Sequence, residues 1–257
     1  MSEIEWWRLK AAEINALAQR DAVVIVPIGS IEQHGPHLPT QVDTLLVGEI
    51  ARRAARQVAA TTPVVVVPTV WSGLAEHHIS LGGTLSLDLA TFLALLRCIC
   101  RSLVRQGFRR IFLLNGHGGN IAALTVAVNE MAVELEAPIA AASYWPLAAE
   151  AFVQILERQE TVRHACEAET SMMLALAPQL VDMSRAAEAV GPTGREVSEV
   201  VGSDAVHRWR SFKSRTSHGA IGDPRTASPE KGERLLAAAA HAVAQIVSSQ
   251  EFWALPA

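Results

Sequence analysis

Cysteine is scarce in this chain of 257 residues, which contains only Cys98, Cys100 and Cys166. An odd number of cysteines, none in C-x-x-C spacing, argues against a disulfide framework and against a thiolate metal site. The first residues, MSEIEWWRLK, mix acidic, aromatic and basic side chains, unlike a signal peptide. We therefore expect a reduced protein of the cytoplasm.

Basic clusters, aromatic residues and long apolar runs are also few. The net charge is -4 and aromatic residues make up 5% of the chain. A nucleic-acid partner, which selects basic surfaces, is therefore not expected. The apolar stretch LLAAAAHAVAQIV is interrupted by His241 and Gln245 and is too short to span a bilayer, so no membrane partner is expected either.

Short apolar segments alternate along the chain with segments that have apolar residues every three to four positions. The first kind predicts buried parallel strands at 22–28, 63–70, 110–115 and 138–145. The second kind predicts helices near 43–59, 88–106, 118–135, 165–177 and 229–249. This alternation indicates an α/β sandwich with a mainly parallel central sheet. Without a repeat or a linker, we expect a single domain over 1–257.

The segment 190–228 differs from the rest because it is rich in Gly, Ser, Thr, Arg and Lys and has little periodicity. It is too long for an ordinary connection, so we interpret it as a lid or a subunit contact, with a disordered surface loop as the alternative.

Histidine follows three of the predicted strands. The sequences are GSIEQHGPH, WSGLAEHHISLGGT and GHGGN. Ligands of open α/β sheets bind beyond the carboxyl ends of the strands, so the three loops should open onto one edge of the sheet.

Glu32, His34, Asp43 and His117 form the set that we predict to bind metal. Carboxylate oxygen with neutral imidazole nitrogen suits Zn²⁺, Mn²⁺ or Fe²⁺. The set exceeds what one catalytic ion needs, and with a further carboxylate it would suit two ions. Taken alone, Asp43 has a second interpretation as the cap of the following helix, and Glu32 as a solvated loop acid.

The sequence NGHGGN at 115–120 allows three interpretations. A dinucleotide loop is disfavoured because Ile121 stands where the third glycine of G-x-G-x-x-G belongs. An oxyanion loop of a serine hydrolase lacks its G-x-S-x-G partner. In the third, which we favour, the glycines permit tight backbone packing while His117 faces a metal.

A further acidic segment is RHACEAETSMM, at 163–173. Glu167 and Glu169 lie two positions apart, so on a helix they diverge by roughly 200° and cannot both face one pocket. His164, just before the helix, could donate to an oxyanion or move a proton, or it could face solvent.

Several other residues have weaker claims to a site. Of the adjacent His77 and His78, we place one near the pocket. Tyr144 and Trp145 end a predicted strand, at a position where residues that line a substrate pocket are expected, although core packing explains them equally well. His37 is interpreted as a supporting or structural group.

The sequence resembles the creatininase (creatinine amidohydrolase) family. The resemblance is carried by PIGSIEQHGPHLPTQVDT, GGTLSL, RIFLLNGHGGN, SYW, ETSMMLALAPQLVD and GAIGDPRTASPEKGE, which together span nearly the whole chain. It implies a three-layer α/β/α sandwich, a centre of two divalent ions (Zn²⁺ first, Mn²⁺ or Fe²⁺ as alternatives), hydrolysis of amide C–N bonds and a homo-oligomer, commonly a hexamer.

Carried over residue by residue, the resemblance makes Glu32, His34, Asp43 and His117 metal ligands, with Asp43 bridging. Creatininase proper has G-H-Y-E-N in the block after this histidine, and its glutamate position is Gly119 here. The branch with N-G-H-G-G-N takes the acid from the E-T-S block, which indicates Glu169 as the fifth ligand.

The same resemblance suggests catalytic and substrate-binding residues. His164 matches a family histidine credited with a role in turnover, and Trp145 matches a substrate-contacting tryptophan. With them we place Glu167 as a catalytic proton acceptor, with Glu169 as the alternative acceptor if Glu167 is the ligand instead, and His78 and Tyr144 as substrate contacts.

The expected reaction is hydrolysis of a small linear or cyclic amide. Two ions lower the pKa of water toward ~7 and polarise the carbonyl. His164 would then stabilise the oxyanion or protonate the leaving nitrogen. Alternatives are a formamide deformylase, a peptidase of the mycofactocin-precursor type, and a non-catalytic binding protein on the same fold.

Overall fold

Four parallel strands form the central sheet of the computed structural model, which describes residues 3–192 and 208–254. The strands are β1 (Val23–Ile28), β2 (Val64–Val66), β3 (Arg110–Asn115) and β4 (Ile139–Ser143). Their order across the sheet is β2-β1-β3-β4, with every neighbour parallel. The predicted α/β class with a parallel central sheet is therefore confirmed. The strand order reverses between β1 and β3, which is where open α/β sheets bind ligands.

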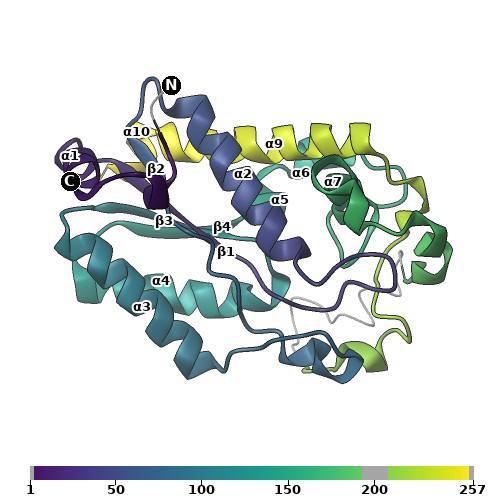
Figure 1. Ribbon diagram of the computed structural model, residues 1–257. Coiled ribbons are helices and arrows are strands. Elements are labelled where there is room, and N and C mark those ends of the chain that lie inside the picture. Colours follow the sequence, from purple (N-terminus) through teal and green to yellow (C-terminus); the bar gives the residue numbers. More distant parts are fainter. Residues whose placement is uncertain (1–2, 193–207, 255–257) are drawn as a thin grey trace.

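Helices cover both faces of this sheet (Figure 1). One face carries α2 (Val42–Val58), α5 (Tyr144–Leu147), α6 (Ala149–Val153), α7 (Glu167–Leu176), α9 (Pro229–Ser248) and α10 (Gln250–Trp253). The other face carries α1 (Ala11–Gln19), α3 (Leu89–Arg105) and α4 (Ile121–Leu135). Short 3-10 helices complete the chain: η1 (Trp6–Arg8), η2 (Glu76–Leu81), η3 (Gly118–Asn120), η4 (Pro178–Leu180), η5 (Met183–Ala189), η6 (Phe212–Ser214) and η7 (Pro224–Thr226). The result is the α/β/α arrangement expected.

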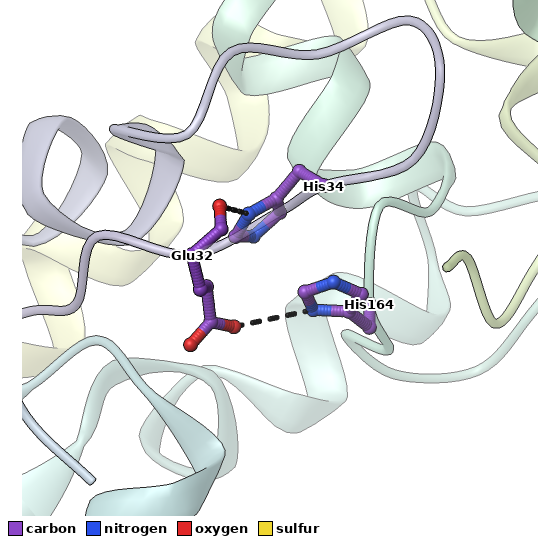
Figure 2. A group of neighbouring side chains, drawn as sticks. All are labelled: Glu32, His34 and His164. Carbon is purple, nitrogen blue, oxygen red and sulfur yellow. Dashed lines mark hydrogen bonds and ion pairs between the residues drawn. The ribbon is translucent and has the colours of Figure 1, made fainter. Parts of the chain in front are cut away.

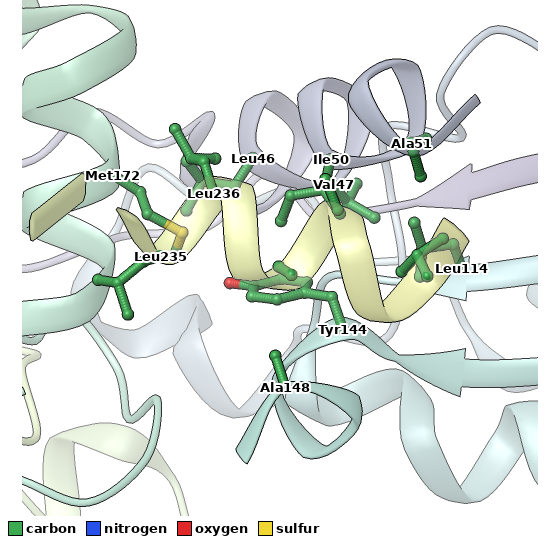
Figure 3. Close-up of a cluster of buried hydrophobic side chains, with 14 of the residues drawn as sticks. Leu46, Val47, Ile50, Ala51, Leu114, Tyr144, Ala148, Met172, Leu235 and Leu236 are labelled. Atoms are coloured by element: carbon green, nitrogen blue, oxygen red, sulfur yellow. The ribbon is translucent and has the colours of Figure 1, made fainter. Parts of the chain in front are cut away.

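Apolar residues at helical spacing build the core on each face. In α2, Leu46, Val47 and Ile50 are fully buried and pack toward Leu235 and Leu236 of α9 (Figure 3). Burying side chains of this kind contributes about 1.5–3 kcal/mol each. This packing holds the first turn of α2 rigidly above the carboxyl edge of the sheet.

Local signals explain where two of the long helices begin. The Asp88 carboxylate accepts a hydrogen bond from the Thr91 amide at 2.8 Å and so caps α3. Ser228 accepts from the Lys231 amide at 3.3 Å, and Pro229 occupies the first position of α9, where the missing N–H costs nothing.

Gly116 allows α2 to approach the end of β3. A Cβ atom at this position would lie 2.7 Å from the Val47 Cβ and 2.9 Å from the Asp43 carbonyl oxygen. The close contact fits the interpretation that the glycines of NGHGGN serve backbone packing, and it brings the start of α2 against the loop that carries His117.

Two predicted strands are shorter than expected. The strand predicted over 63–70 is regular only over Val64–Val66, where Pro63 and Pro68 flank it and lack the N–H that a ladder requires. The strand predicted over 138–145 ends at Ser143, and Tyr144 and Trp145 instead open α5, whose first turn accommodates Pro146.

The segment 190–228 is described only in part, because 193–207 lie outside the described residues. Its later part includes η6 and η7, and η6 packs against η2 near the edge of the sheet. Among the described helices, none combines the length and apolar character that crossing a membrane requires.

Candidate metal centre

The carboxyl ends of β1 and β3 bring five of the predicted residues together. Glu32 and His34 lie in the loop after β1, Asp43 in the first turn of α2, His117 directly before η3 and Glu169 in the first turn of α7. Each is at most 4% exposed, so the cluster is almost dry. Side chains that are far apart in the sequence thus share one buried site at the switch point of the sheet.

Asp43 stands at the centre of the cluster. Its Oδ1 lies 3.2 Å from His34 Nε2, and its Oδ2 lies 2.9 Å from His117 Nδ1. The N-terminal cap of α2 is Gln41, without a capping bond from a side chain, so Asp43 does not serve as the helix cap. One carboxylate therefore faces two imidazoles through two different oxygens.

Two groups of candidate ligands share Asp43. In one, Glu32 and His117 join it, and Glu32 Oε2 lies 2.9 Å from His117 Nδ1. In the other, His34 and Glu169 join it, and His34 Nε2 lies 3.9 Å from Glu169 Oε2. Within each group the ligand atoms lie within 4.8 Å of one another.

The two histidines present one particular nitrogen to the cluster because the other is tied to the backbone. His34 Nδ1 donates to the Glu32 carbonyl at 3.1 Å, and His117 Nε2 donates to the Leu74 carbonyl at 3.2 Å. In the neutral form of each ring, the lone pair is then on His34 Nε2 or His117 Nδ1. A backbone carbonyl that fixes the tautomer is the usual support for a metal-binding histidine.

The residues present fit a divalent transition metal. Buried atoms without a hydrogen-bond partner are rare in proteins, yet Glu32 Oε2 and His34 Nε2 are two such atoms here. Imidazole nitrogen with carboxylate oxygen is the donor set of Zn²⁺, Mn²⁺ and Fe²⁺. The cluster therefore has the chemistry and the unsatisfied atoms of a metal site.

Electrostatics support the same conclusion. Burial raises the pKa of Glu32, and it raises the pKa of Glu169 to about 8 with help from the nearby Asp43 carboxylate. Burial alone would lower the pKa of His34, but Asp43, Glu169 and Glu32 outweigh it and raise that pKa to about 9. Without a cation, these shifts favour protons on Glu169 and His34 near neutral pH, and a bound metal ion would compete with those protons.

Three further side chains line the cluster. His164 approaches Glu32 with its Nδ1 3.5 Å from Oε1, and it completes a third possible ligand group with Glu32 and His34 (Figure 2). His78 Nε2 lies 3.3 Å from the same oxygen. The ring of Phe212 covers both imidazoles, with centroid distances of 4.0 Å to His78 and 4.7 Å to His164.

Comparison with known proteins shows to which protein family the chain belongs. The family model described as Creatininase: Creatinine amidohydrolase matches residues 7–247. The chain belongs to the creatininase family. It is accordingly a hydrolase of carbon–nitrogen bonds.

Individual relatives of the family agree with this assignment. The creatinine amidohydrolase of Pseudomonas putida is 30% identical over 97% of this chain and 96% of its own length. The mycofactocin precursor peptide peptidase of Mycolicibacterium smegmatis is 32% identical over 84% and 80%. The similarity thus extends to relatives named for different substrates.

Solved structures of creatininases share the fold. One crystal structure of creatinine amidohydrolase superposes with a TM-score of 0.82 at 28% identity, covering 98% of this chain and 99% of its own. A variant of Zn-Zn type, a variant complexed with creatine and a manganese form have TM-scores of 0.80, 0.80 and 0.81 at 27–28% identity, each covering 96% of this chain and 98% of its own.

Gly119 marks where this member of the creatininase family departs from the G-H-Y-E-N pattern. A Cβ atom there would lie 2.3 Å from the Leu74 carbonyl oxygen and 2.4 Å from His117 Nε2. The surrounding atoms thus leave no room at this position for a side chain, and Glu169 is a candidate carboxylate of the same cluster.

Glu167 does not join the cluster. Its carboxylate accepts hydrogen bonds from the amides of Glu157 and Arg158, at 3.1 and 2.8 Å, and from Lys231 Nζ at 2.6 Å. These contacts on the far side of α7 argue for a structural role and against the predicted catalytic one. The separation of Glu167 from Glu169 that helical geometry predicts is what the structure shows.

The predicted substrate contacts have mixed outcomes. Tyr144 is 1% exposed and packs among core residues beneath α9, so its burial argues against a substrate contact (Figure 3). Trp145 is half-buried at the rim of that core, and its substrate contact stays a prediction. His78 does lie at the cluster, but Glu32 and Gln33 already occupy both of its ring nitrogens.

Gln33 is the residue that the sequence interpretation missed. Its side-chain nitrogen lies 2.8 Å from His78 Nδ1, 3.1 Å from His164 Nε2 and 3.0 Å from the Gly219 carbonyl. Because Gln33 Nε2 can only donate, His78 accepts at Nδ1 and its Nε2–H points at Glu32. Its position between Glu32 and His34 in the sequence could have indicated a role at the site. It was not predicted because only ionisable residues of this loop were considered as candidates.

His37 also has a defined role. Its Nε2 lies 2.9 Å from Thr170 Oγ1, next to Glu169 in α7, and burial lowers its pKa to about 4. It supports the helix that carries a ligand, in keeping with the supporting role expected for it.

Proposed function

We propose that the protein hydrolyses a C–N amide bond of a small molecule at a centre of two divalent ions, held by Glu32, His34, Asp43, His117 and Glu169. The observation that carries this proposal is the central position of Asp43, whose two oxygens face two histidines that belong to two separate ligand groups. A carboxylate in this position suits a pair of ions a few ångströms apart. When bound, the ions would polarise the amide carbonyl and make water acidic enough to attack it near neutral pH.

The ligand residues would divide between two positions. Glu32, Asp43 and His117 would hold one ion, and His34, Asp43 and Glu169 the other. The Zn-Zn and manganese forms of related creatininases support Zn²⁺ or Mn²⁺ as the occupants. The cytoplasmic location and the homo-oligomer, a hexamer by family resemblance, belong to the same proposal.

We propose that His164 transfers a proton during the reaction. Its Nε2 lies 2.8 Å from the Gln33 carbonyl, which can only accept, so Nε2 carries the proton of the neutral ring. Burial lowers the pKa of this imidazole well below its usual range and keeps the ring neutral. Its Nδ1 lone pair therefore faces the cluster, where we propose that it takes up a proton and passes it to the leaving nitrogen.

His78 and Gln33 act as positioning residues in this scheme. The His78 Nε2–H donates to Glu32 Oε1, which orients that carboxylate, while Gln33 donates to His78 with its side-chain amide and accepts from His164 with its backbone carbonyl. The Phe212 ring covers these groups and excludes water from them. The low-dielectric surroundings strengthen each of these interactions.

A direct test combines elemental analysis with a substrate panel. We expect about two transition-metal ions per chain in the purified protein and hydrolysis of a member of a panel of creatinine, formamides, cyclic imides and small peptides. The similarity to a mycofactocin precursor peptide peptidase supports including peptides.

Two substitutions connect the metal with turnover. His117→Ala and Glu32→Ala should abolish both metal retention and hydrolysis, since each removes a ligand of the same ion. His241→Ala, which changes an exposed histidine of α9, is the matched control and should leave both unchanged. Full metal occupancy in the first two variants would contradict the ligand assignment.

A further inference from the structure

The turn that follows 193–207 in the chain places a cation beside the metal centre. In this turn η6 packs against η2, and Phe212 covers His78 and His164. Arg215 directly follows η6, and its amide donates to the Phe212 carbonyl at 2.9 Å. Its guanidinium carbon lies 5.6 Å from the centre of the Phe212 ring. The Phe212 ring therefore lies close both to the guanidinium and to the two imidazoles next to Glu32.

Arg215 is only partly exposed and lacks an acidic partner. Its Nε is buried without a hydrogen-bond partner, and no ion pair joins it to any acid in the part of the chain that the structure describes. The guanidinium is close enough to His77 to help lower the pKa of that imidazole, for which burial is the main cause. A shielded, unpaired guanidinium N–H costs free energy unless a ligand satisfies it.

Arg53 shows what a structural arginine looks like in the same molecule. It is similarly half-buried, and its guanidinium forms ion pairs with Glu49 at 2.9 Å and Glu233 at 2.6 Å. Arg215 has the Phe212 ring beneath it but no carboxylate in front of it. Within residues 3–192 and 208–254, therefore, no carboxylate completes the Arg215 guanidinium as Glu49 and Glu233 complete that of Arg53.

We infer that Arg215 binds a carboxylate of the substrate, so that the amide cleaved at the metal centre is part of a small carboxylic acid. The inference rests on the proposed function and deepens it. The planar guanidinium carries parallel N–H donors in a geometry that matches a carboxylate. The positive charge of two divalent ions would also exceed the negative charge of the three carboxylates of the centre, so the site with bound metal would attract an anion.

The test compares acids with their uncharged amides. The probes are N-acetylglycine and N-acetyl-β-alanine, and each is compared with its primary amide. Calorimetric titration measures the affinity for each probe, first with the protein as purified and then after metal removal. We expect the unmodified protein to bind at least one acid more tightly than its amide. Arg215→Met should weaken binding of that acid about ten- to a hundredfold, the usual loss of a charge-assisted pair, and leave the amide unchanged.

Two further variants separate charge from structure. Lys213→Met removes an exposed cation of the same turn and should change neither affinity. Arg215→Lys keeps the charge without the planar fork and should recover part of the preference. Equal affinity of the unmodified protein for acid and amide, including no detectable binding of either, overturns the inference, as does an Arg215→Met variant that weakens both alike.

The outcomes also distinguish this inference from the proposed function. Retention of the Arg215-dependent preference in a protein that holds no metal and cleaves no amide would refute the reaction and keep the carboxylate site. Metal-dependent hydrolysis of uncharged amides, with no effect of Arg215→Met, would support the proposed reaction and refute the carboxylate site.

Discussion

Glu167 and Glu169 lie in the same turn of α7, both are nearly inaccessible to solvent, and their surroundings are opposite. Two backbone amides and Lys231 satisfy the Glu167 carboxylate. Glu169 accepts one amide, that of Ala165, and otherwise faces Asp43 and His34. One carboxylate is thus compensated by the protein itself, while the other belongs to a group whose charges the protein leaves unbalanced.

The difference shows how to distinguish a structural from a functional buried acid. A buried carboxylate needs hydrogen bonds or a cation, or else its pKa rises. Two amides and Lys231 compensate the buried Glu167 carboxylate, whereas burial and neighbouring carboxylates raise the pKa of Glu169 to about 8. The protein therefore maintains a destabilising arrangement at Glu169, which is expected where a metal ion supplies the missing charge.

Replacement of the shared ligand should have the largest effect. Asp43→Asn keeps the size of the side chain but removes the charge that both ligand groups share. We expect loss of both ions and a fall in kcat/KM of about 10³-fold or more, since metal polarisation supplies several kcal/mol. Elemental analysis and steady-state kinetics on the substrate found in the panel provide the measurement. Retention of two ions per chain would show that Asp43 does not bridge.

Glu169→Gln should affect one ion only. The group of Glu32, Asp43 and His117 stays complete in this variant, so metal content should fall from about two ions to about one per chain. Hydrolysis should fall about 10²-fold, less than for Asp43→Asn, because one ion can still polarise the carbonyl.

The metal-free form of this variant offers a second measurement. Gln at 169 can still accept the Ala165 amide, and it removes a carboxylate that is costly to bury. The midpoint of urea unfolding of the metal-free protein should therefore be unchanged or higher. A clear loss of stability would indicate that Glu169, like Glu167, is a structural acid.

Much of the fold could be predicted from the sequence because its signals are local. Apolar runs of five to eight residues and helical periodicity depend on nearby positions only, and they located the strands and long helices to within a few residues. The convergence of the loops after β1, β2 and β3 followed from the rule for parallel strands. This is why Glu32, His34 and His117 could be expected at one edge of the sheet.

The partners of individual side chains could not be predicted in the same way. The role of Glu167 depends on Lys231, which is distant in the sequence and reaches α7 only because α9 packs beside it. Tyr144 lies in the core because β4 ends two residues before the predicted boundary. Gln33 connects His78, through its side-chain amide, with His164, through its backbone carbonyl, and both contacts span large sequence separations.

Glu167→Gln should have the smallest effect on catalysis and a measurable one on folding. The substitution leaves Lys231, whose side chain is 13% exposed, with the exposed Glu157 as its remaining acidic partner. Weakening a buried ion pair in this way should lower the free energy of unfolding by about 2–3 kcal/mol. Metal content and kcat/KM of the folded protein should match those of the unmodified protein, because the carboxylate contacts no ligand.

Glu157→Gln is the matched control for this prediction. Glu157 pairs with the same lysine at 2.7 Å, but its side chain is 60% exposed, so water screens the interaction. Its loss should therefore lower the stability much less than the loss of the Glu167 carboxylate. Urea unfolding of the two variants measures the difference between a buried and an exposed partner of one lysine. A large fall in kcat/KM for Glu167→Gln, with metal content intact, would restore the catalytic role that the hydrogen bonds of Glu167 argue against.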